Sequence, residues 1–261
     1  MGAKPSGATR RDISRLRGLA RHASDRRAAG EILLEGAKVI GAAMTSDLEL
    51  LGLYVGSGAD QQVIDQATSG GCPVFEVDDL SLARITTTAT PQPEVAVARR
   101  PTHHLADIEG HPLVVGVDLQ DPGNAGTLVR SALSAGAAGV VFCGDSVDPF
   151  SPKTVRSSAG AVFGLPVLEA GDPLEVLSDL HDRGLQLMAT DSSGSADLFE
   201  VDLSAPSAFV LGNEAHGLTN AVLDGCDTVL RIPMAAGESL NVGVAASVVL
   251  FEAFRQRRKE A

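Results

Sequence analysis

Short runs of almost wholly apolar residues alternate with helix-like segments in the second part of this chain, and this alternation limits the possible folds more than any other feature. The runs lie at residues 113–118, 139–143, 185–190, 208–211 and 228–232. Strands that are apolar on both sides must be covered on both faces, which is typical of parallel sheets flanked by helices. We therefore predict an α/β domain over residues 110–261, with a mostly parallel sheet and helices on both of its faces.

The preceding residues show a smaller version of the same alternation. A short strand and turn at residues 31–36 comes first. Further helix-like and strand-like segments follow at residues 37–44, 48–55, 61–69, 73–77 and 80–86. Elements of these lengths predict a small α/β domain over residues 28–100. A polar, turn-rich stretch at residues 99–110 marks the boundary between the two domains.

Composition limits the class of protein. The chain has 261 residues, of which 44% are hydrophobic, so it can bury a substantial core. No apolar run approaches the length of a membrane span, and the basic N-terminus lacks the apolar core of a signal peptide. The cysteines Cys72, Cys143 and Cys226 lie far apart, in or beside apolar stretches, without metal-type spacing. We therefore expect reduced structural thiols, no metal ion and a cytoplasmic protein.

Charge is distributed unevenly along the chain. The formal net charge of −12 argues against a nucleic-acid partner, but residues 1–27 hold eight Lys and Arg against two Asp. These residues form a basic N-terminal arm with a net charge of +6, followed by a remainder of −18. Residues 1–9 are predicted to be a flexible leader, with a helix-like segment after them. The arm suggests a patch for a polyanion, although a solvated tail without a partner has the same composition.

Polar residues and turn glycines follow the predicted strand at residues 113–118. Asn124, Gly126 and Arg130 lie on a turn and on a helix that begins at or just after Asn124. Arg130 lies outside the apolar stripe of this helix. The stripe consists of Ala125, Leu128, Val129, Ala132 and Leu133. The same pattern is also typical of an ordinary helix with Asn124 as its N-cap and a solvated arginine.

Two later strand ends have the same character. The run at residues 208–211 leads into a glycine-rich turn with Glu214, and the strand at residues 228–232 leads through a loop to Asn241. Because the carboxyl ends of parallel strands lie at one edge of a sheet, we expect Arg130, Glu214 and Asn241 to meet in one site. The chain contains no dinucleotide, P-loop, zinc-hydrolase or serine-hydrolase motif, which excludes these classes.

The three polar blocks resemble the signature motifs of the SpoU/TrmH family of RNA ribose 2′-O-methyltransferases, in the SPOUT superfamily. The blocks similar to motifs 1, 2 and 3 are, in order, Asn124 to Arg130, residues 212–218, and residues 232–234 with 239–242. A segment at residues 148–160 also resembles the family, and the resemblance covers roughly residues 113–258. The N-terminal domain is similar, less specifically, to the family's ribosomal-protein-like, RNA substrate-binding domain.

The resemblance implies a deep trefoil knot in the C-terminal domain, against the general rule that chains are unknotted. It also implies a homodimer formed through that catalytic domain. S-adenosylmethionine is the implied cofactor, held by backbone groups of the knot loops. Carried over by motif, the cofactor-binding residues are Leu211, Gly212, Ile232, Met234, Ser239 and Leu240.

The resemblance further implies methyl transfer to a ribose 2′-oxygen, with Arg130, Asn124, Glu214 and Asn241 as catalytic residues. A ribose hydroxyl is a weak nucleophile, so either its proton must be removed or its developing charge must be stabilised. Because a guanidinium stays protonated in proteins, we expect Arg130 to grip the target phosphate and stabilise the forming alkoxide. Glu214 would hold Arg130 in place, or serve as a structural ion-pair partner, while Asn124 and Asn241 would fix the loops and the ribose.

We expect RNA to be recognised through its phosphates and shape, because the chain has one Tyr and no Trp for stacking on bases. The candidate phosphate contacts are Arg10, Arg11, Arg15, Arg17, Arg21, Arg26, Arg27 and Arg156, with the tail arginines Arg255, Arg257 and Arg258. A separate substrate-binding domain favours large-subunit ribosomal RNA as the target. A tRNA ribose 2′-O-methyltransferase, a drug-resistance methyltransferase acting on ribosomal RNA, and a catalytically silent ribosome-assembly factor remain alternatives.

Overall fold

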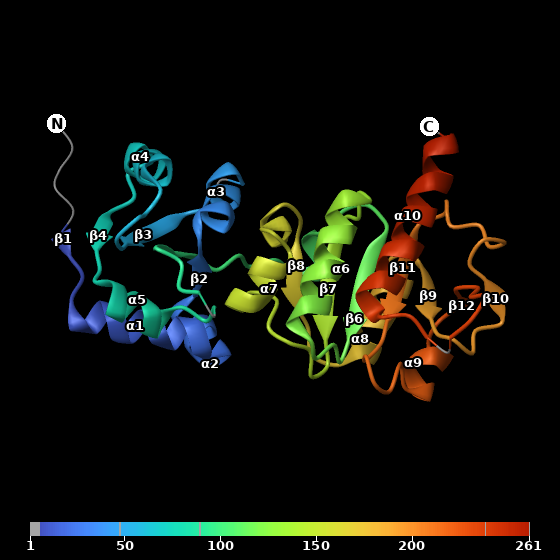
Figure 1. Ribbon diagram of the computed structural model, residues 1–261. Helices are drawn as coiled ribbons and strands as arrows, with labels where there is room; N and C mark the ends of the chain where they lie inside the picture. Colours follow the sequence, from blue (N-terminus) through green and yellow to red (C-terminus); the bar gives the residue numbers. More distant parts are fainter. Residues whose placement is uncertain (1–5, 47, 89, 238, 261) are drawn as a thin grey trace. The chain divides into compact units, whose positions relative to one another are not determined.

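The computed structural model describes residues 6–46, 48–88, 90–237 and 239–260 (Figure 1). The chain divides into two compact units. Unit 1 consists of Met1–Pro101 and Phe150–Phe163, and unit 2 consists of Thr102–Pro149 and Gly164–Ala261. Unit 1 is therefore discontinuous in sequence.

Unit 1 contains a mixed five-stranded sheet with the order β1-β4-β3-β5-β2. Its strands are β1 (Ser6–Gly7), β2 (Glu31–Glu35), β3 (Leu50–Val55), β4 (Val74–Glu76) and β5 (Glu94–Arg99). β5 runs antiparallel to β2 and β3, whereas β4 runs parallel to β1 and β3. The sequence pattern does not predict β5, and it places β1 within the leader expected to be flexible.

The helices of unit 1 pack on this sheet or on one another. They are α1 (Arg10–Arg21), α2 (Ala23–Ala29), α3 (Ala37–Thr45), α4 (Gln61–Ser69), α5 (Asp79–Ile85), α7 (Pro152–Ser157) and the 3-10 helix η2 (Ala161–Phe163). Thr9 and Asp12 form a capping box that starts α1. Leu16 and Leu19 of α1 are buried in one cluster with Leu33 of β2, and burying a leucine side chain contributes about 1.5–3 kcal/mol. The basic segment of the sequence is thus one well-anchored helix followed by a second short one.

Unit 2 contains a seven-stranded sheet with the order β10-β12-β9-β11-β6-β7-β8. Its strands are β6 (Leu113–Val117), β7 (Gly139–Cys143), β8 (Val167–Glu169), β9 (Gln186–Thr190), β10 (Ala196–Asp197), β11 (Ser207–Leu211) and β12 (Thr228–Arg231). Every pairing in this sheet is parallel. The α/β class and the parallel sheet predicted from the apolar runs are therefore confirmed.

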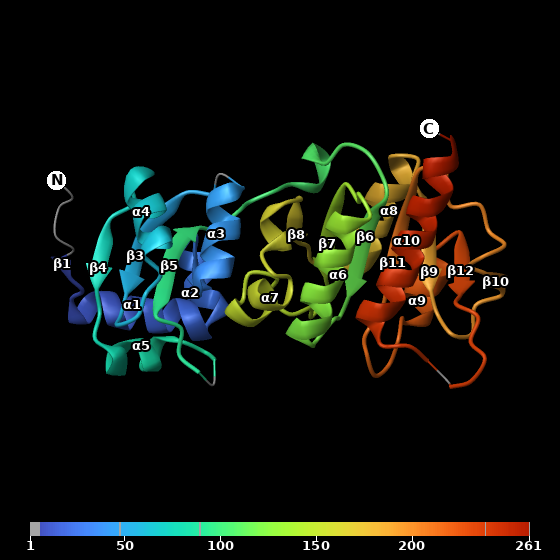
Figure 2. The ribbon, with the colours of Figure 1, turned by 45° about the horizontal axis from the view of Figure 1, so that its top comes forward.

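Helices cover both faces of the unit 2 sheet (Figure 2). They are α6 (Pro122–Ser134), α8 (Pro173–Asp182), α9 (Asn220–Asp224) and α10 (Val242–Glu260), with the 3-10 helix η1 (Leu105–Asp107) before β6. On one face, Val115 and Val210 of the sheet lie in a buried cluster with Leu177 of α8 and Val222 of α9. α6 and α10 pack against each other on the other face, beside β7 and β11. None of these described helices is both long and apolar enough to cross a membrane.

Helix α6 begins earlier than the sequence pattern predicts. Its N-cap is Asp121, whose side chain accepts a hydrogen bond from the backbone N–H of Asn124, and Pro122 occupies its first turn. Asn124 is therefore inside the helix, and the prediction that it caps the helix is wrong. Leu133, expected in the buried stripe, is 38% exposed.

The three cysteines are free thiols, and Cys72 and Cys143 are buried. Burial raises the pKa of Cys143 to about 12 and that of Cys72 and of Cys226 to about 11. Since the thiolate is the reactive form, all three are poor nucleophiles at neutral pH. They fit the expected structural role.

Candidate active site

The carboxyl ends of β9, β11 and β12 and the start of α10 enclose a cavity of about 460 Å³ in unit 2. The residues carried over by motif as cofactor ligands all line it, namely Leu211, Gly212, Ile232, Met234, Ser239 and Leu240. Glu214 and Asn241 also line this cavity. Three strand ends that are far apart in the sequence thus meet at one place, as expected from a parallel sheet.

The turn after β11 is shaped by backbone crowding and by one asparagine. A Cβ atom on Gly212 would lie 2.5 Å from the carbonyl carbon of Gly217, so only glycine fits there. The Asn213 side chain accepts hydrogen bonds from the backbone N–H groups of Ala215 and His216 and donates to the carbonyl oxygen of Asp118. These contacts fix the turn against the end of β6.

The end of β9 contributes residues that the sequence motifs do not include. Thr190, Asp191 and Ser192 line the cavity. The Thr190 hydroxyl oxygen is buried and has no hydrogen-bond partner among the described residues, and an unsatisfied buried polar atom at a cavity wall is available for a ligand. One Asp191 carboxylate oxygen accepts hydrogen bonds from the N–H and hydroxyl of Ser193. The only sequence signal for this wall is that polar residues follow another apolar strand.

Glu214, Asn124 and Asn241 form a continuous hydrogen-bond network. Glu214 Oε1 accepts from Asn124 Nδ2 at 3.0 Å, and Asn124 Oδ1 accepts from Asn241 Nδ2 at 2.8 Å. Asn241 Oδ1 in turn accepts from the N–H of Gly243, in the first turn of α10. Asn124 is therefore bonded to one residue from each of the other two motif-like blocks, and the network joins the β11 turn to α6 and α10.

Glu214 also binds the backbone before α6. Its two carboxylate oxygens accept from the N–H groups of Gln120 and Asp121, at 3.1 and 3.0 Å. Partial burial acts to raise the pKa of Glu214, but the hydrogen bonds from Gln120, Asn124 and Asp121 outweigh burial, and the pKa lies below its ordinary value. The carboxylate is thus held in its ionised form.

Arg130 does not pair with Glu214. It is an exposed residue of α6, and the described part of the chain gives its guanidinium no hydrogen bond or ion pair, while Glu214 has the other partners just named. The expected role of Glu214 in holding Arg130 is therefore wrong in this chain. Glu214 instead positions the start of the helix that carries Arg130.

The charges around the cavity favour a cation. Of the described residues that line it, Asp191 and Glu214 are acidic and none is Lys or Arg. A phosphate-bearing ligand would face these carboxylates without a compensating cation, whereas a positively charged ligand would be attracted by both. The backbone crowding at Gly212, the free hydroxyl of Thr190 and the two carboxylates together suit a small cationic cofactor such as S-adenosylmethionine.

Two of the predicted phosphate contacts serve the fold of unit 1. Arg26 is 3% exposed, and its Nη1 donates to the carbonyl oxygen of Leu19 at 2.7 Å. Arg156 pairs with Glu35 at 2.6 Å. The prediction that Arg26 and Arg156 bind RNA is therefore wrong, because Arg26 is buried and Arg156 is bound in an ion pair.

The other predicted phosphate-binding arginines differ in whether they form ion pairs or hydrogen bonds within the protein. Arg15 forms an ion pair with Glu31 at 2.6 Å, and one nitrogen of Arg21 donates to a backbone carbonyl. Arg10, Arg11, Arg17, Arg21 and Arg27 are all exposed. In the C-terminal helix, Arg255 binds Glu252, and Arg258 lies over the Phe254 ring.

Arg257 stabilises the fold of unit 2. It donates from both terminal nitrogens to the carbonyl oxygens of His111 and Ala135, at 2.9 and 3.1 Å. Burial lowers the pKa of Arg257 from its usual value. This guanidinium fastens the end of α10 to unit 2 and is not available for RNA.

Similarity to known proteins agrees with this geometry. Residues 111–251 match the model of the SpoU rRNA Methylase family, and residues 11–96 match the MRM3-like substrate binding domain. The chain belongs to the SpoU rRNA methylase family. The matched family region includes β6 to β12 and the first half of α10, so it contains every residue of the network and the cavity.

Relatives within the SpoU rRNA methylase family include proteins that modify ribosomal RNA. The chain is 38% identical over 176 residues to the 23S rRNA (uridine(2479)-2′-O)-methyltransferase of Streptomyces viridochromogenes, a match that covers 64% of this chain and 61% of that relative. The chain therefore spans less than two thirds of that relative's length.

Solved structures match more completely. The SpoU methyltransferase AviRb from Streptomyces viridochromogenes, in complex with AdoMet, has a TM-score of 0.89 at 30% identity, covering 96% of this chain and 99% of that one. An AdoMet-bound rRNA methyltransferase from Sinorhizobium meliloti has a TM-score of 0.84 at 31% identity, covering 96% of each chain. Both similar structures hold the cofactor that the cavity of this chain suits.

Proposed function

We propose that this protein uses S-adenosylmethionine to methylate a ribose 2′-oxygen in large-subunit ribosomal RNA. The observation that carries the proposal is the network of Glu214, Asn124 and Asn241 beside a cavity that favours a cation. Family membership and the AdoMet-bound similar structures support the choice of cofactor. The similarity to a 23S rRNA methyltransferase supports the choice of ribosomal RNA.

Cavity residues at the end of β11 and in the loop between β12 and α10 would hold the cofactor. These are Leu211, Gly212, Ile232, Met234, Ser239 and Leu240, with Thr190 and Asp191 as additional polar groups. When bound, S-adenosylmethionine supplies an electrophilic methyl group on a sulfonium. The crowded turn at Gly212 fixes the cavity wall before a ligand arrives, which lowers the entropic cost of binding.

Arg130 is the proposed contact to the RNA. Its guanidinium is exposed and not neutralised by a described residue, so it can bind the target phosphate with a planar fork of donors. The same positive charge stabilises the oxyanion that forms as the 2′-hydroxyl is deprotonated. The proton leaves to water or to a phosphate, because a guanidinium remains charged. Glu214, Asn124 and Asn241 position α6, and hence Arg130, relative to the cavity.

Unit 1 is the proposed RNA-binding part, which the MRM3-like substrate binding match supports. Its phosphate contacts are the exposed arginines Arg10, Arg11, Arg17, Arg21 and Arg27. Deleting residues 1–27 would remove these charges and also α1, so single charge reversals such as Arg10→Glu and Arg17→Glu are the cleaner test. Each lost phosphate contact should make the dependence of log K on log salt concentration shallower by about 0.7–0.9.

A homodimer is proposed through unit 2. Val244 and Phe251 on α10 are 47% and 46% exposed, and Leu133 on the adjacent α6 is also exposed. Apolar side chains of this size on neighbouring helices are typical of a surface covered by a partner. Because the chain resembles dimeric family members, we propose that this partner is a second copy of the chain.

A trefoil knot in unit 2 is also proposed from the resemblance. β12 lies between β9 and β10, which are joined by a short loop. In this loop, a Cβ on Gly194 would lie 2.7 Å from the carbonyl carbon of Leu230 in β12. Pulling the full chain from residues 113 and 258 in a single-molecule experiment tests the knot, since a tightened knot shortens the fully extended length.

Because ribosomal RNA is the proposed target, we place the protein in the cytoplasm.

Two measurements test the function. Calorimetry should detect S-adenosylmethionine binding, and its absence would favour a catalytically silent assembly factor. Maps of 2′-O-methyl marks on total RNA, with and without the protein, should differ at a position in large-subunit ribosomal RNA. A difference confined to tRNA would instead support the tRNA methyltransferase alternative.

A further inference from the structure

Helix α7 and the turn after it lie between β7 and β8 in the sequence, yet residues 150–163 belong to unit 1. We propose that this segment is a built-in part of the substrate-binding unit and that Arg156 is the positioning residue that holds it there. The proposal rests on the function proposed above, because it assigns to Arg156 an effect on RNA methylation. Arg156 acts through α7 and touches neither cofactor nor RNA.

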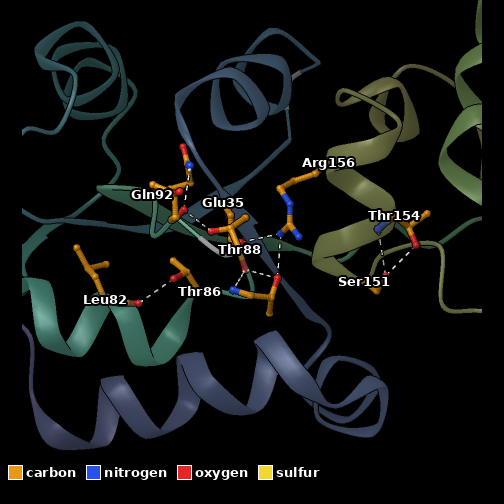
Figure 3. Close-up of polar contacts among 10 residues, drawn as sticks. Glu35, Leu82, Thr86, Thr88, Gln92, Ser151, Thr154 and Arg156 are labelled. Atoms are coloured by element: carbon orange, nitrogen blue, oxygen red, sulfur yellow. Dashed lines mark hydrogen bonds and ion pairs between the residues drawn. The ribbon is translucent and has the colours of Figure 1, made fainter. Parts of the chain in front are cut away.

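A buried ion pair is the first reason (Figure 3). Arg156 Nη1 lies 2.6 Å from Oε2 of Glu35, whose side chain is 0% exposed. The other oxygen of Glu35 accepts from the N–H and the hydroxyl of Thr87, each at 3.0 Å, and Arg156 Nη1 also donates to the Thr87 hydroxyl at 2.9 Å. A carboxylate buried this deeply needs a cation beside it. The end of β2 therefore requires an arginine that comes from α7.

Two further contacts fasten the segment within unit 1. Gly160 has a φ of 84°, and a Cβ on it would lie 2.4 Å from the Cβ of Ala42 in α3. This close approach is possible only for glycine. At the other end, the Arg100 guanidinium lies 4.7 Å from the centroid of the Phe150 ring. The segment is thus held at its start, its middle and its end.

The residues just before α7 hold the turn that leads into α6. In the loop after β7, the N–H of Asp145 donates to Asp118 Oδ1 at 2.7 Å, and its carbonyl accepts from Gln120 Nε2 at 2.6 Å. The N–H of Val147 donates to the carbonyl oxygen of Leu119 at 2.7 Å. Gln120 is also one of the residues bound by Glu214. A few residues of chain therefore connect the Arg156 anchor to the turn that positions Asn124 and Arg130.

The covalent path from unit 1 to the motif-like turn gives Arg156 its proposed role. Fixing α7 fixes the end of the loop at residues 144–149, which contacts the turn at residues 118–120. Loss of the anchor should disturb RNA methylation while leaving the cofactor cavity intact, because the cavity is formed by β9, β11, β12 and α10.

The test compares Arg156→Ala, Arg156→Lys and Glu35→Gln with Arg99→Ala in the full-length protein. Arg99 is the matched control, because it forms an exposed ion pair with Glu49 in the same unit. Hydrogen exchange of residues 150–163 should accelerate by about tenfold or more in Arg156→Ala and hardly at all in Arg99→Ala. KM for RNA should rise by a similar factor, while Kd for S-adenosylmethionine stays within about twofold of wild type.

The lysine variant should recover most of the loss, since it keeps a cation beside Glu35. If Arg156→Ala does not fold, Glu35→Gln carries the test, because it leaves only a partly exposed arginine without its partner. Unchanged exchange in residues 150–163, or kinetic constants equal to those of Arg99→Ala, would overturn the proposal. A parallel fall in RNA and cofactor affinity would also overturn it. Faster exchange in a protein whose wild type methylates no RNA would refute the proposed function instead.

Discussion

Replacing Asn124 with aspartate is the sharpest test of the network at the candidate active site. Asn124 Nδ2 donates to Glu214 Oε1 at 3.0 Å, and Asn124 Oδ1 accepts from Asn241 Nδ2 at 2.8 Å. Aspartate keeps the shape and the acceptor for Asn241. It replaces the donor to Glu214 with a second carboxylate oxygen, so an attraction becomes a repulsion between like charges.

The magnitude follows from the geometry. Two unit charges about 4 Å apart interact by about 4 kcal/mol at an effective dielectric constant of about 20, and by about 1 kcal/mol in bulk water. Because Glu214 is exposed at the cavity edge, the repulsion should cost about 1–3 kcal/mol, in addition to about 1 kcal/mol for the lost hydrogen bond. Asn124→Ala loses both hydrogen bonds but adds no charge, and should cost about 1–2 kcal/mol.

The two variants should also differ in pH dependence. In the wild type the pKa of Glu214 is lowered, so its contribution to the free energy of unfolding is present above the unfolded-state pKa and is lost as pH falls through the folded-state pKa. In Asn124→Asp the repulsion raises the pKa of the carboxyl pair. Its destabilisation is therefore full at neutral pH and shrinks as pH falls through that raised pKa.

Urea unfolding of both variants, from about pH 4 to pH 8, measures this difference. Asn124→Asp should be the less stable variant at neutral pH, and the gap to Asn124→Ala should close on acidification and in high salt. If the two variants follow the same pH profile, Asn124 and Glu214 are not in contact and the network does not exist.

Three further variants each test one feature. Arg130→Lys should leave the urea midpoint unchanged and lower kcat by about tenfold or more, because lysine lacks the planar fork; wild-type turnover would contradict the clamp role. Gly212→Ala should abolish S-adenosylmethionine binding in calorimetry, since its Cβ would lie 2.5 Å from the Gly217 carbonyl carbon; retained affinity would disprove the crowded turn. Val244→Arg combined with Phe251→Arg should reduce the mass in light scattering to that of one chain, and a persisting dimer would exclude this interface.

The elements that the sequence predicts well are those whose burial leaves a simple pattern. Strands such as Gly139–Cys143 are apolar throughout because helices cover both faces of the sheet. β10 is not predicted, because a strand of two residues is too short to show periodicity. β1 escapes it because its pairing with β4 depends on a strand far along the chain.

The sequence predicts which residues come together where they belong to recognisable blocks, and it does not predict this for the others. Glu214, Asn124 and Asn241 stand in three such blocks, and the structure brings them together. Thr190 and Asp191 line the same cavity but follow a strand without any motif. Their place in the cavity wall depends on where β9 lies in the sheet, which no local pattern records.

Charge in the sequence does not reveal whether an arginine is paired. Arg17 and Arg26 have similar neighbours in a basic segment, yet Arg17 is exposed whereas Arg26 is buried, with only 3% of its surface exposed. Arg156 is bound to Glu35, which lies 121 positions earlier in the chain. Composition can therefore indicate a basic surface but not the residues that form it.

The two carboxylates at the cavity, Asp191 and Glu214, also bear on turnover. Under the proposed reaction, transfer of the methyl group converts a sulfonium into a neutral thioether, so the attraction that these carboxylates exert on the ligand ends when the reaction does. The demethylated cofactor should therefore dissociate from the cavity more readily than S-adenosylmethionine does. Product inhibition should be weak at low ionic strength and become stronger, relative to substrate binding, as salt screens the two charges.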